Sequence, residues 1–142
     1  MKALLSLLLA LSLPALALAD WGTDYQAAVA QAKAQNKLVL LHFTGSDWCP
    51  YCQILDKEVL SKPSFQNFAD KHYVGVLLDF PQNSPQSDAL VKQNADLAQK
   101  YQVQAFPTLL VTTPDGKEVG RQEGYDPGSG PNAVITKLKS FK

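Results

Sequence analysis

Cysteine and arginine are scarce in this chain of 142 residues, which has two cysteines, Cys49 and Cys52, and one arginine, Arg121. Charge of either sign is not in excess, because Lys and Arg together number 13 and so do Asp and Glu. Phosphate binding requires concentrated Lys and Arg, so this balance argues against a nucleic-acid-binding surface. We also find no internal repeat, domain linker or heptad run, and the length suits one domain of ordinary size.

The N-terminus differs in composition from the rest of the chain. Residues 3–13 are almost wholly apolar behind the positively charged start Met1-Lys2, and the small residues of Ala17-Leu18-Ala19 precede Asp20. This is the layout of a secretory signal peptide, residues 1–19, with cleavage after Ala19. A transmembrane anchor is the alternative, but the apolar run is short for a span of ~20 residues.

Cleavage after Ala19 would leave a mature domain of residues 20–142. The residue directly after the predicted cleavage site is Asp20 and not a cysteine, so nothing suggests a lipoprotein anchor. The domain is expected to be periplasmic or secreted and to meet the membrane only during export. In such a compartment a disulfide between Cys49 and Cys52 can persist.

The hydrophobic pattern predicts helices that alternate with strands. The helices are expected at 24–36 (with Thr23 as its cap), from the cysteines to Leu60, at 63–71, at 88–101 (with Leu90, Val91, Leu97 and Tyr101 on its inner side) and at 131–142. Strands are expected at 38–43, 73–79, 107–112 and 117–122. Alternation implies parallel crossovers, and the turn at Pro114-Asp115-Gly116 implies a hairpin. The predicted fold is α/β, a mixed four-stranded sheet with helices on both faces.

The stretch "TGSDWCPYCQIL" places both cysteines two residues apart, and three roles are open to such a pair. As a structural bridge it would close a loop of four residues and contribute only about 2 kcal/mol. A zinc site usually needs four protein ligands, and His42 and His72 lack the spacing of a ligand pair. A Cu(I) site that uses both thiolates stays open, because soft ligands suit that ion.

A redox role has a physical mechanism in its favour. Cys49 falls where a strand and a turn deliver the chain to a helix N-terminus, and Pro50 suits the first helical position. Unpaired backbone N–H groups at that position favour a thiolate. Cys52 lies one turn along on the same side, so it can close the disulfide and resolve a mixed disulfide formed by Cys49.

Two motifs resemble those of the thioredoxin superfamily. Trp48-Cys49-Pro50-Tyr51-Cys52 resembles the thioredoxin active site, W-C-x-x-C, and "FPT" at Phe106-Pro107-Thr108 matches the family's cis-proline segment. The segments "FTGSDWC", "LDFP", "FPTLLV" and "PDGKEVGR" resemble an exported bacterial thioredoxin-like subfamily. The likeness runs from about residue 21 to 140, and it implies a thioredoxin fold with an extra N-terminal helix.

The resemblance also implies a role for each site residue. Cys49 would be the attacking thiolate and Cys52 the resolving thiol. Pro107, in cis, would pack beside the disulfide and leave the backbone groups of Phe106 free to pair with an extended substrate. Trp48 would shape the rim of the site, with Pro50 and Tyr51 beside it on the substrate side.

Three features depart from the family pattern. His42 occupies the position where thioredoxins commonly carry a buried acid that helps to move protons from the resolving cysteine; it is either a proton-transfer group or a core residue bonded to backbone. The lysine that often accompanies that acid is absent, since no Lys lies between Lys71 and Lys92. The dipeptide Pro50-Tyr51 is that of glutaredoxins, although Trp48 and the lack of a glycine pair after Pro107 fit that family poorly.

The sequence therefore predicts an exported thiol–disulfide oxidoreductase that reduces protein disulfides without a bound cofactor. It is expected to be a monomer that meets protein disulfide substrates and a redox-recycling partner, such as a membrane electron donor. Oxidase or isomerase activity is the nearest alternative, and a non-catalytic Cu(I)-binding module is an alternative of another class.

Overall fold

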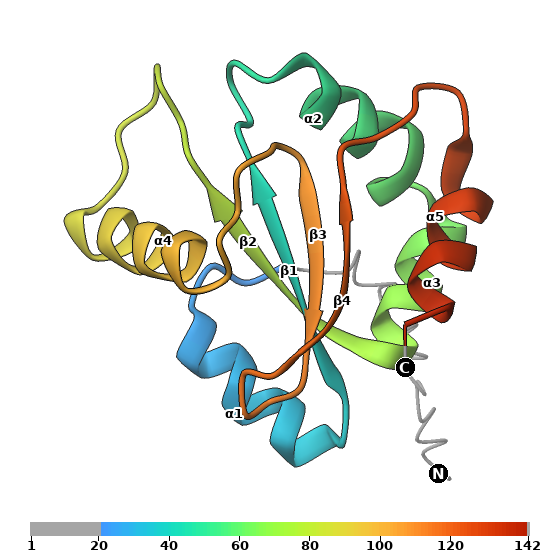
Figure 1. Ribbon diagram of the computed structural model, residues 1–142, viewed down its shortest axis with the longest axis horizontal. Coiled ribbons are helices and arrows are strands. Elements are labelled where there is room, and N and C mark those ends of the chain that lie inside the picture. Colours follow the sequence, from blue (N-terminus) through green and yellow to red (C-terminus); the bar gives the residue numbers. More distant parts are fainter. Residues whose placement is uncertain (1–20, 142) are drawn as a thin grey trace, which may run out of the picture.

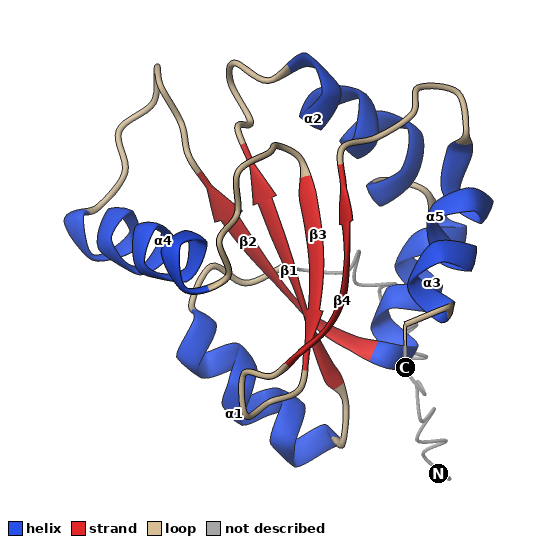
Figure 2. Cartoon of the chain, in the orientation of Figure 1, coloured by secondary structure: helices blue, strands red, loops and turns tan. Residues whose placement is uncertain are grey.

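The computed structural model describes residues 21–141, so the predicted signal peptide and its cleavage site lie outside the described residues. The elements, shown in Figures 1 and 2, are α1 (Tyr25–Gln35), β1 (Leu38–Thr44), α2 (Pro50–Leu55), the π-helical turn η1 (Asp56–Leu60), α3 (Pro63–His72), β2 (Tyr73–Asp79), α4 (Asp88–Lys100), β3 (Thr108–Thr112), β4 (Glu118–Glu123) and α5 (Gly130–Lys139). Each expected strand and helix is present with small differences at its ends. No helix within residues 21–141 is long and apolar enough to cross a membrane.

The four strands form one mixed sheet in the order β2-β1-β3-β4. β1 runs parallel to β2 and antiparallel to β3, which forms the predicted hairpin with β4. Thr44 pairs with Asp79, and Phe43 pairs with Thr108. The ends of β1 and β2 and the start of β3 therefore meet at one end of the sheet.

Helices cover both faces of the sheet, as the sequence predicted (Figure 1). α1 and α4 pack on one face, where Val39, Leu41 and Phe43 point from β1 into a buried apolar cluster. α2, η1, α3 and α5 pack on the other face around Leu40. Burial of apolar side chains on both sides of β1, each worth roughly 1.5–3 kcal/mol, makes this strand the rigid support of the segment that follows it.

Three local predictions need correction. The cap of α1 is Asp24, whose Oδ1 accepts the Ala27 N–H at 3.0 Å, and not Thr23. Val91 does not face inward, since 51% of it is exposed, and α4 buries Asn94 instead. The Asn94 side chain donates to the Asp79 carbonyl at 3.0 Å, so a polar contact with the end of β2 sets the inner face of the helix.

The helix that begins at the cysteines reaches Leu60, but it does not stay α-helical. After Leu55 it widens into the η1 turn, in which the Ser61 N–H donates to the Asp56 carbonyl, five residues back, at 2.9 Å. Single π-turns of this kind often occur at functional sites. The widening places Asp56 directly beyond the cysteine-bearing helix.

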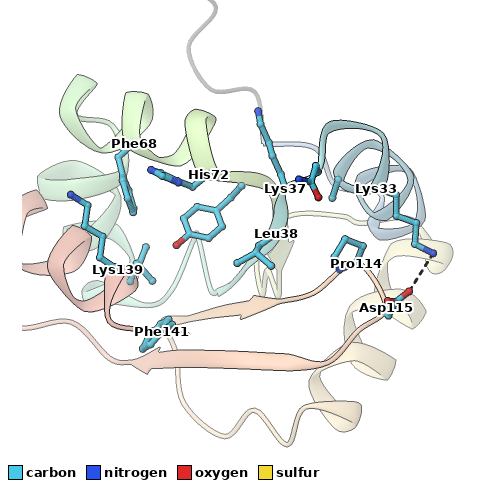
Figure 3. Close-up of a pocket in the computed structure, with 13 residues that line it drawn as sticks. Lys33, Lys37, Leu38, Phe68, His72, Pro114, Asp115, Lys139 and Phe141 are labelled. Carbon is cyan, nitrogen blue, oxygen red and sulfur yellow. Dashed lines mark ion pairs between the residues drawn. The ribbon is translucent and has the colours of Figure 1, made fainter.

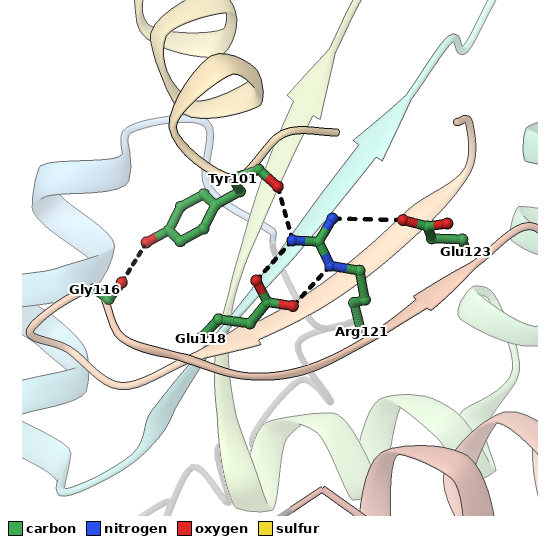
Figure 4. A network of polar contacts seen from close by, with 5 residues as sticks. All are labelled: Tyr101, Gly116, Glu118, Arg121 and Glu123. Atoms are coloured by element: carbon green, nitrogen blue, oxygen red, sulfur yellow. Dashed lines mark hydrogen bonds and ion pairs between the residues drawn. The ribbon is translucent and has the colours of Figure 1, made fainter. Parts of the chain in front are cut away.

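The only arginine holds the chain that leads into β3 (Figure 4). Arg121 donates through Nε and Nη2 to both carboxylate oxygens of Glu118, at 2.7 and 2.6 Å, and through Nη2 to the Tyr101 carbonyl at 2.7 Å. The Tyr101 hydroxyl donates to the Gly116 carbonyl at 2.9 Å. The end of α4 is thereby fixed to β4 and its hairpin just before the segment 102–107.

Candidate active site

Cys49 and Cys52 form a disulfide at the start of α2, with their Cα atoms 5.3 Å apart. Cys49 is the N-cap residue, and its Sγ accepts the Cys52 N–H at 3.3 Å. The Cys52 Sγ accepts the Gly45 N–H at 3.5 Å. Cys49 is 4% exposed and Cys52 is fully buried, as expected for an outer and an inner cysteine. The backbone donor directed at the Cys49 Sγ at the helix N-terminus favours a thiolate at Cys49 in the reduced protein.

The peptide bond between Phe106 and Pro107 is cis, as the resemblance implied. The bond lies just before Thr108, at the end of the sheet where β1 leads into the cysteine turn. Its surroundings are fixed, because the Pro107 carbonyl accepts the Gly124 N–H at 2.7 Å and the Thr108 hydroxyl donates to the Ala105 carbonyl at 2.7 Å. Within residues 21–141, the Phe106 amide and carbonyl have no hydrogen-bond partner. They are available to an extended chain.

Three aromatic side chains stand beside the cysteine turn. Trp48 and Phe106 meet edge to face with ring centres 5.8 Å apart, and Phe106 packs on Phe80 at 5.2 Å. The indole N–H of Trp48 donates to the Phe80 carbonyl at 2.7 Å, which fixes the ring although 36% of it is exposed. Pro50 and Tyr51 are exposed on the first turn of α2. The sequence therefore identified a set of residues that the fold brings together.

The turn before Trp48 is bonded to the loop 80–87. The Asp47 carboxylate accepts the N–H groups of Gln82 and Asn83 at 2.9 and 2.8 Å. These bonds lower the pKa of Asp47 below its ordinary value. Asp79 accepts both the N–H and the hydroxyl of Ser46, at 2.9 and 2.5 Å. The loop 80–87 thus forms a wall of the site, and Asp79 anchors the turn that leads to the cysteines.

His42 is buried in β1, with 1% of its surface exposed and the edge of its ring toward Trp21, at 5.8 Å between ring centres. Burial lowers its pKa to about 4, so the imidazole is neutral at physiological pH. Its Nε2 has no hydrogen-bond partner among the described residues. His42 is thus buried in the core, but within residues 21–141 its Nε2 lacks the backbone partner that the core interpretation predicted.

Sequence reasoning missed Asp56. Burial, and secondarily the charge of Asp79, raise the pKa of Asp56 from 3.8 to about 6. Asp56 lines a cavity of about 280 Å³ together with His42. The available signal was its spacing, since a residue four positions after Cys52 shares its helix face.

A larger cavity lies away from the cysteines (Figure 3). It has a volume of about 620 Å³ and is lined by residues at the start of β1 and β2, the β3–β4 turn and α5, including Leu38, Tyr73 and Asp115. Lys33 forms an ion pair with Asp115 at 3.6 Å at its edge. This cavity is at the end of the sheet opposite Thr44 and Asp79, and no predicted site residue lines it. Within residues 21–141, no group of three or more His, Cys, Asp or Glu side chains is arranged to hold a metal ion.

The sequence model of the thioredoxin-like domain matches residues 25–139. The chain is similar to the disulfide bond reductase DsbH of Chlamydia pneumoniae, with 36% identity over 117 residues, 82% of this chain and 69% of that protein. It is 31% identical over 140 residues to the thioredoxin-related protein DsbJ of the same organism, covering 93% of this chain and 40% of that protein.

Solved structures agree with the sequence matches. A structure of DsbH oxidoreductase superposes with a TM-score of 0.78 at 36% identity, covering 84% of this chain and 81% of the other. A disulphide isomerase from Xylella fastidiosa Temecula1 gives 0.64 at 28% identity, covering 92% and 100%. With the family's sequence model matched from α1 to α5 and this fold arranged around a Cys-x-x-Cys disulfide, the chain belongs to the thioredoxin-like family and is a thiol–disulfide oxidoreductase.

Proposed function

We propose that the protein reduces disulfides in exported proteins, with Cys49 as the attacking residue and Cys52 as the resolving residue. The observation that carries these roles is the asymmetry of the pair. Cys49 is the outer residue at the helix cap and its Sγ accepts a backbone N–H, whereas Cys52 is enclosed. The direction of electron flow is supported by the likeness to a protein named a disulfide bond reductase.

The first half-reaction begins with the reduced dithiol. The Cys49 thiolate attacks one sulfur of the substrate disulfide, a bond forms between the two sulfurs, and the substrate's own S–S bond breaks. The second substrate sulfur leaves as a thiolate and takes a proton from water. The Cys52 N–H, which lies 3.3 Å from the Cys49 Sγ in the disulfide form, is positioned to stabilise the attacking thiolate.

The second half-reaction releases the substrate. Cys52 loses its proton and attacks the Cys49 sulfur, forming the Cys49–Cys52 bond and breaking the bond to the substrate, whose sulfur leaves as a thiolate. The substrate has then gained two electrons, and the protein holds the disulfide seen in the structure. Another dithiol must reduce that disulfide again before the next cycle.

The surface around Cys49 suits an extended polypeptide. The free backbone groups of Phe106 would pair with the substrate backbone beside Pro107. Trp48 and Tyr51, 36% and 54% exposed, would contact its side chains across Pro50. This recognition uses backbone bonds and apolar contact, so it accommodates many sequences around a cysteine.

Location and partners form part of the same proposal. Residues 1–19 have the composition of a signal peptide cleaved after Ala19, so the oxidised protein would need its electrons from a donor outside the cytoplasm, such as a membrane protein. The relatives DsbH and DsbJ support protein substrates and protein redox partners in general.

The test is the reduction potential of the Cys49–Cys52 pair, measured by equilibration in glutathione or dithiothreitol buffers. A reductase is expected near about −270 mV, whereas about −120 to −180 mV would assign the protein to oxidation or isomerisation. Cysteine variants check the roles: Cys49→Ser is expected to abolish disulfide exchange, and Cys52→Ser to accumulate mixed disulfides with substrate. Full exchange activity in Cys49→Ser would refute the mechanism.

A further inference from the structure

A cavity lies next to η1, the turn that continues the cysteine-bearing helix α2. It has a volume of about 280 Å³ and is lined by Trp21, His42, Asp56, Leu60, Ser61, Gln66 and Leu77. His42 and Leu77 belong to β1 and β2, Asp56 belongs to η1, and Gln66 belongs to α3. Ser61 is exposed, so the cavity reaches the surface. A space of this size with several polar groups on its wall suits ordered water.

His42 gives this cavity a polar inner wall without supplying a base. Its Nε2 is buried and has no hydrogen-bond partner among the described residues. A buried polar nitrogen normally has a partner, and water in the cavity would supply it. The ring is neutral and its pKa is lowered to about 4 by burial, so it holds a proton poorly at physiological pH. A proton acceptor in this cavity would therefore be a different side chain.

Among the described residues that line the cavity, Asp56 is the only carboxylate. The Asp56 N–H donates to the Cys52 carbonyl, so the two residues are one α-helical turn apart. Side chains four positions apart lie on the same face of a helix, with their Cβ atoms about 5–6 Å apart. Cys52 is fully buried, so a proton that leaves its thiol has no direct route to bulk solvent.

We propose that Asp56 accepts the proton of the Cys52 thiol, through water in this cavity, during resolution of the mixed disulfide. The inference rests on the proposed function, because it assigns the proton acceptor of its second half-reaction. The S–H bond of Cys52 breaks, the proton passes to the Asp56 carboxylate, and the sulfur keeps the electron pair with which it attacks Cys49. The proton then leaves through the cavity to solvent at Ser61.

The surrounding charges suit this role. Burial and the nearby charge of Asp79 raise the pKa of Asp56 to about 6, which leaves the carboxylate ionised at pH 7 but basic enough to take a proton. Asp79 also acts on His42, although burial outweighs it there. Among the described residues, the titratable groups near Asp56 are His42 on β1, Asp79 at the end of β2 and Cys52 on α2, while α3 contributes the neutral Gln66.

The experiment follows the two half-reactions separately in the full-length mature protein. Reduced protein is mixed with one equivalent of bis(5-thio-2-nitrobenzoate), a symmetric aromatic disulfide. Attack by Cys49 releases a first coloured thiolate, and attack by Cys52 on the mixed disulfide releases a second. In the unsubstituted protein, the rate of the second release should be constant near pH 7–8 and fall as the pH drops through about 6.

Asp56→Asn is the decisive variant. Its first release should be unchanged, whereas its second should slow by about tenfold or more at pH 7 and rise steadily with pH, because solvent must then accept the proton. Asp56→Glu, which keeps a carboxylate, should restore the plateau. Asp70→Asn, at an exposed carboxylate on α3 whose side chain makes no hydrogen bond within residues 21–141, is the matched control and should leave both releases unchanged.

The outcomes separate the two proposals. No first release in the unsubstituted protein would refute the proposed function itself. A normal first release followed by identical second releases in the unsubstituted and Asp56→Asn proteins would overturn only the role of Asp56. The unsubstituted protein alone provides a second test. If the rate of its second release rises steadily from pH 5 to 8 without a plateau, the role of Asp56 is overturned as well.

Discussion

At the scale of single residues, His42 and Asp56 face one cavity but titrate with opposite effects on stability. The pKa of His42 is lowered from 6.5 to about 4, so as the pH falls below 6.5 the unfolded chain binds the proton first and stability is lost. The pKa of Asp56 is raised from 3.8 to about 6, so the folded chain keeps its proton and stability is lost as the pH rises from 3.8 to 6. The two effects mask each other in the unsubstituted protein.

Replacing either residue should unmask the other. Asp56→Asn is expected to raise the free energy of unfolding at pH 7 by about 1–2 kcal/mol, after allowance for solvent screening, and to change it little at pH 4. In His42→Leu the His42 loss of about 2 kcal/mol between pH 7 and pH 5 should disappear, so that the free energy of unfolding changes over this interval more favourably than in the unsubstituted protein. Urea unfolding at these pH values measures both effects, and stability–pH curves that run parallel in all three proteins would contradict this prediction.

At the scale of elements, the active site depends on two loops that bond each other. The turn 45–48 and the loop 80–87 are joined by Asp47 to Gln82 and Asn83, and by the indole of Trp48 to Phe80. A loop held only by its ends would be among the more mobile parts of the fold. Here the carboxylate of Asp47 fixes the loop next to the residue that precedes Cys49.

Removing that carboxylate should loosen the loop and leave the sheet intact. In Asp47→Ala the amides of Gln82 and Asn83 are expected to exchange with solvent about tenfold faster or more, because each loses its acceptor, while the amide of Leu41 in the central strand keeps its protection. Hydrogen exchange followed by NMR measures this, with Asp70→Ala as the control. Because these bonds lower the pKa of Asp47, acid should release the loop only below the ordinary range of an aspartate. Unchanged exchange at both amides would show that the loop is held by other contacts.

The same elements show what could be read from the sequence. Strands β1 and β2 were predictable because continuous apolar runs bounded by turns suit a buried parallel pair. The cysteine and cis-proline motifs were predictable because each occupies a few adjacent residues. Val91 was placed on the wrong side of α4, since hydrophobicity alone does not show that Asn94 has a buried carbonyl as its partner.

The rest of the site depends on contacts between distant residues. Asp47 and its partners on the loop 80–87 are 35 to 37 positions apart, and a single sequence contains no signal that joins them. The raised pKa of Asp56 arises from its burial and, secondarily, from the charge of Asp79 at the end of β2, which is 23 positions away in the sequence. His42 was recognised as a departure from the family, but only the packing of Trp21 and η1 around it shows that it is neutral.

At the scale of the whole molecule, stability and direction of electron flow are linked. The two redox forms of the folded protein and of the unfolded chain make a thermodynamic cycle. Suppose that the Cys49–Cys52 pair is more reducing in the folded protein than in the unfolded chain. The disulfide form of the protein then has a larger free energy of unfolding than the dithiol form. For this two-electron couple about 30 mV corresponds to about 1.4 kcal/mol.

If the protein is a reductase, its disulfide form should unfold at the higher urea concentration. A pair about 40 mV more reducing than in the unfolded chain corresponds to a difference of about 2 kcal/mol between the two forms. Urea unfolding with and without dithiothreitol measures this difference, and a variant with both Cys49→Ser and Cys52→Ser controls for effects of the reductant elsewhere, since the chain has no other cysteine. If the reduced form is instead the more stable one, the protein would act as an oxidant that transfers its disulfide to other proteins. That result would reverse the proposed direction of electron flow, even if both cysteines act as assigned.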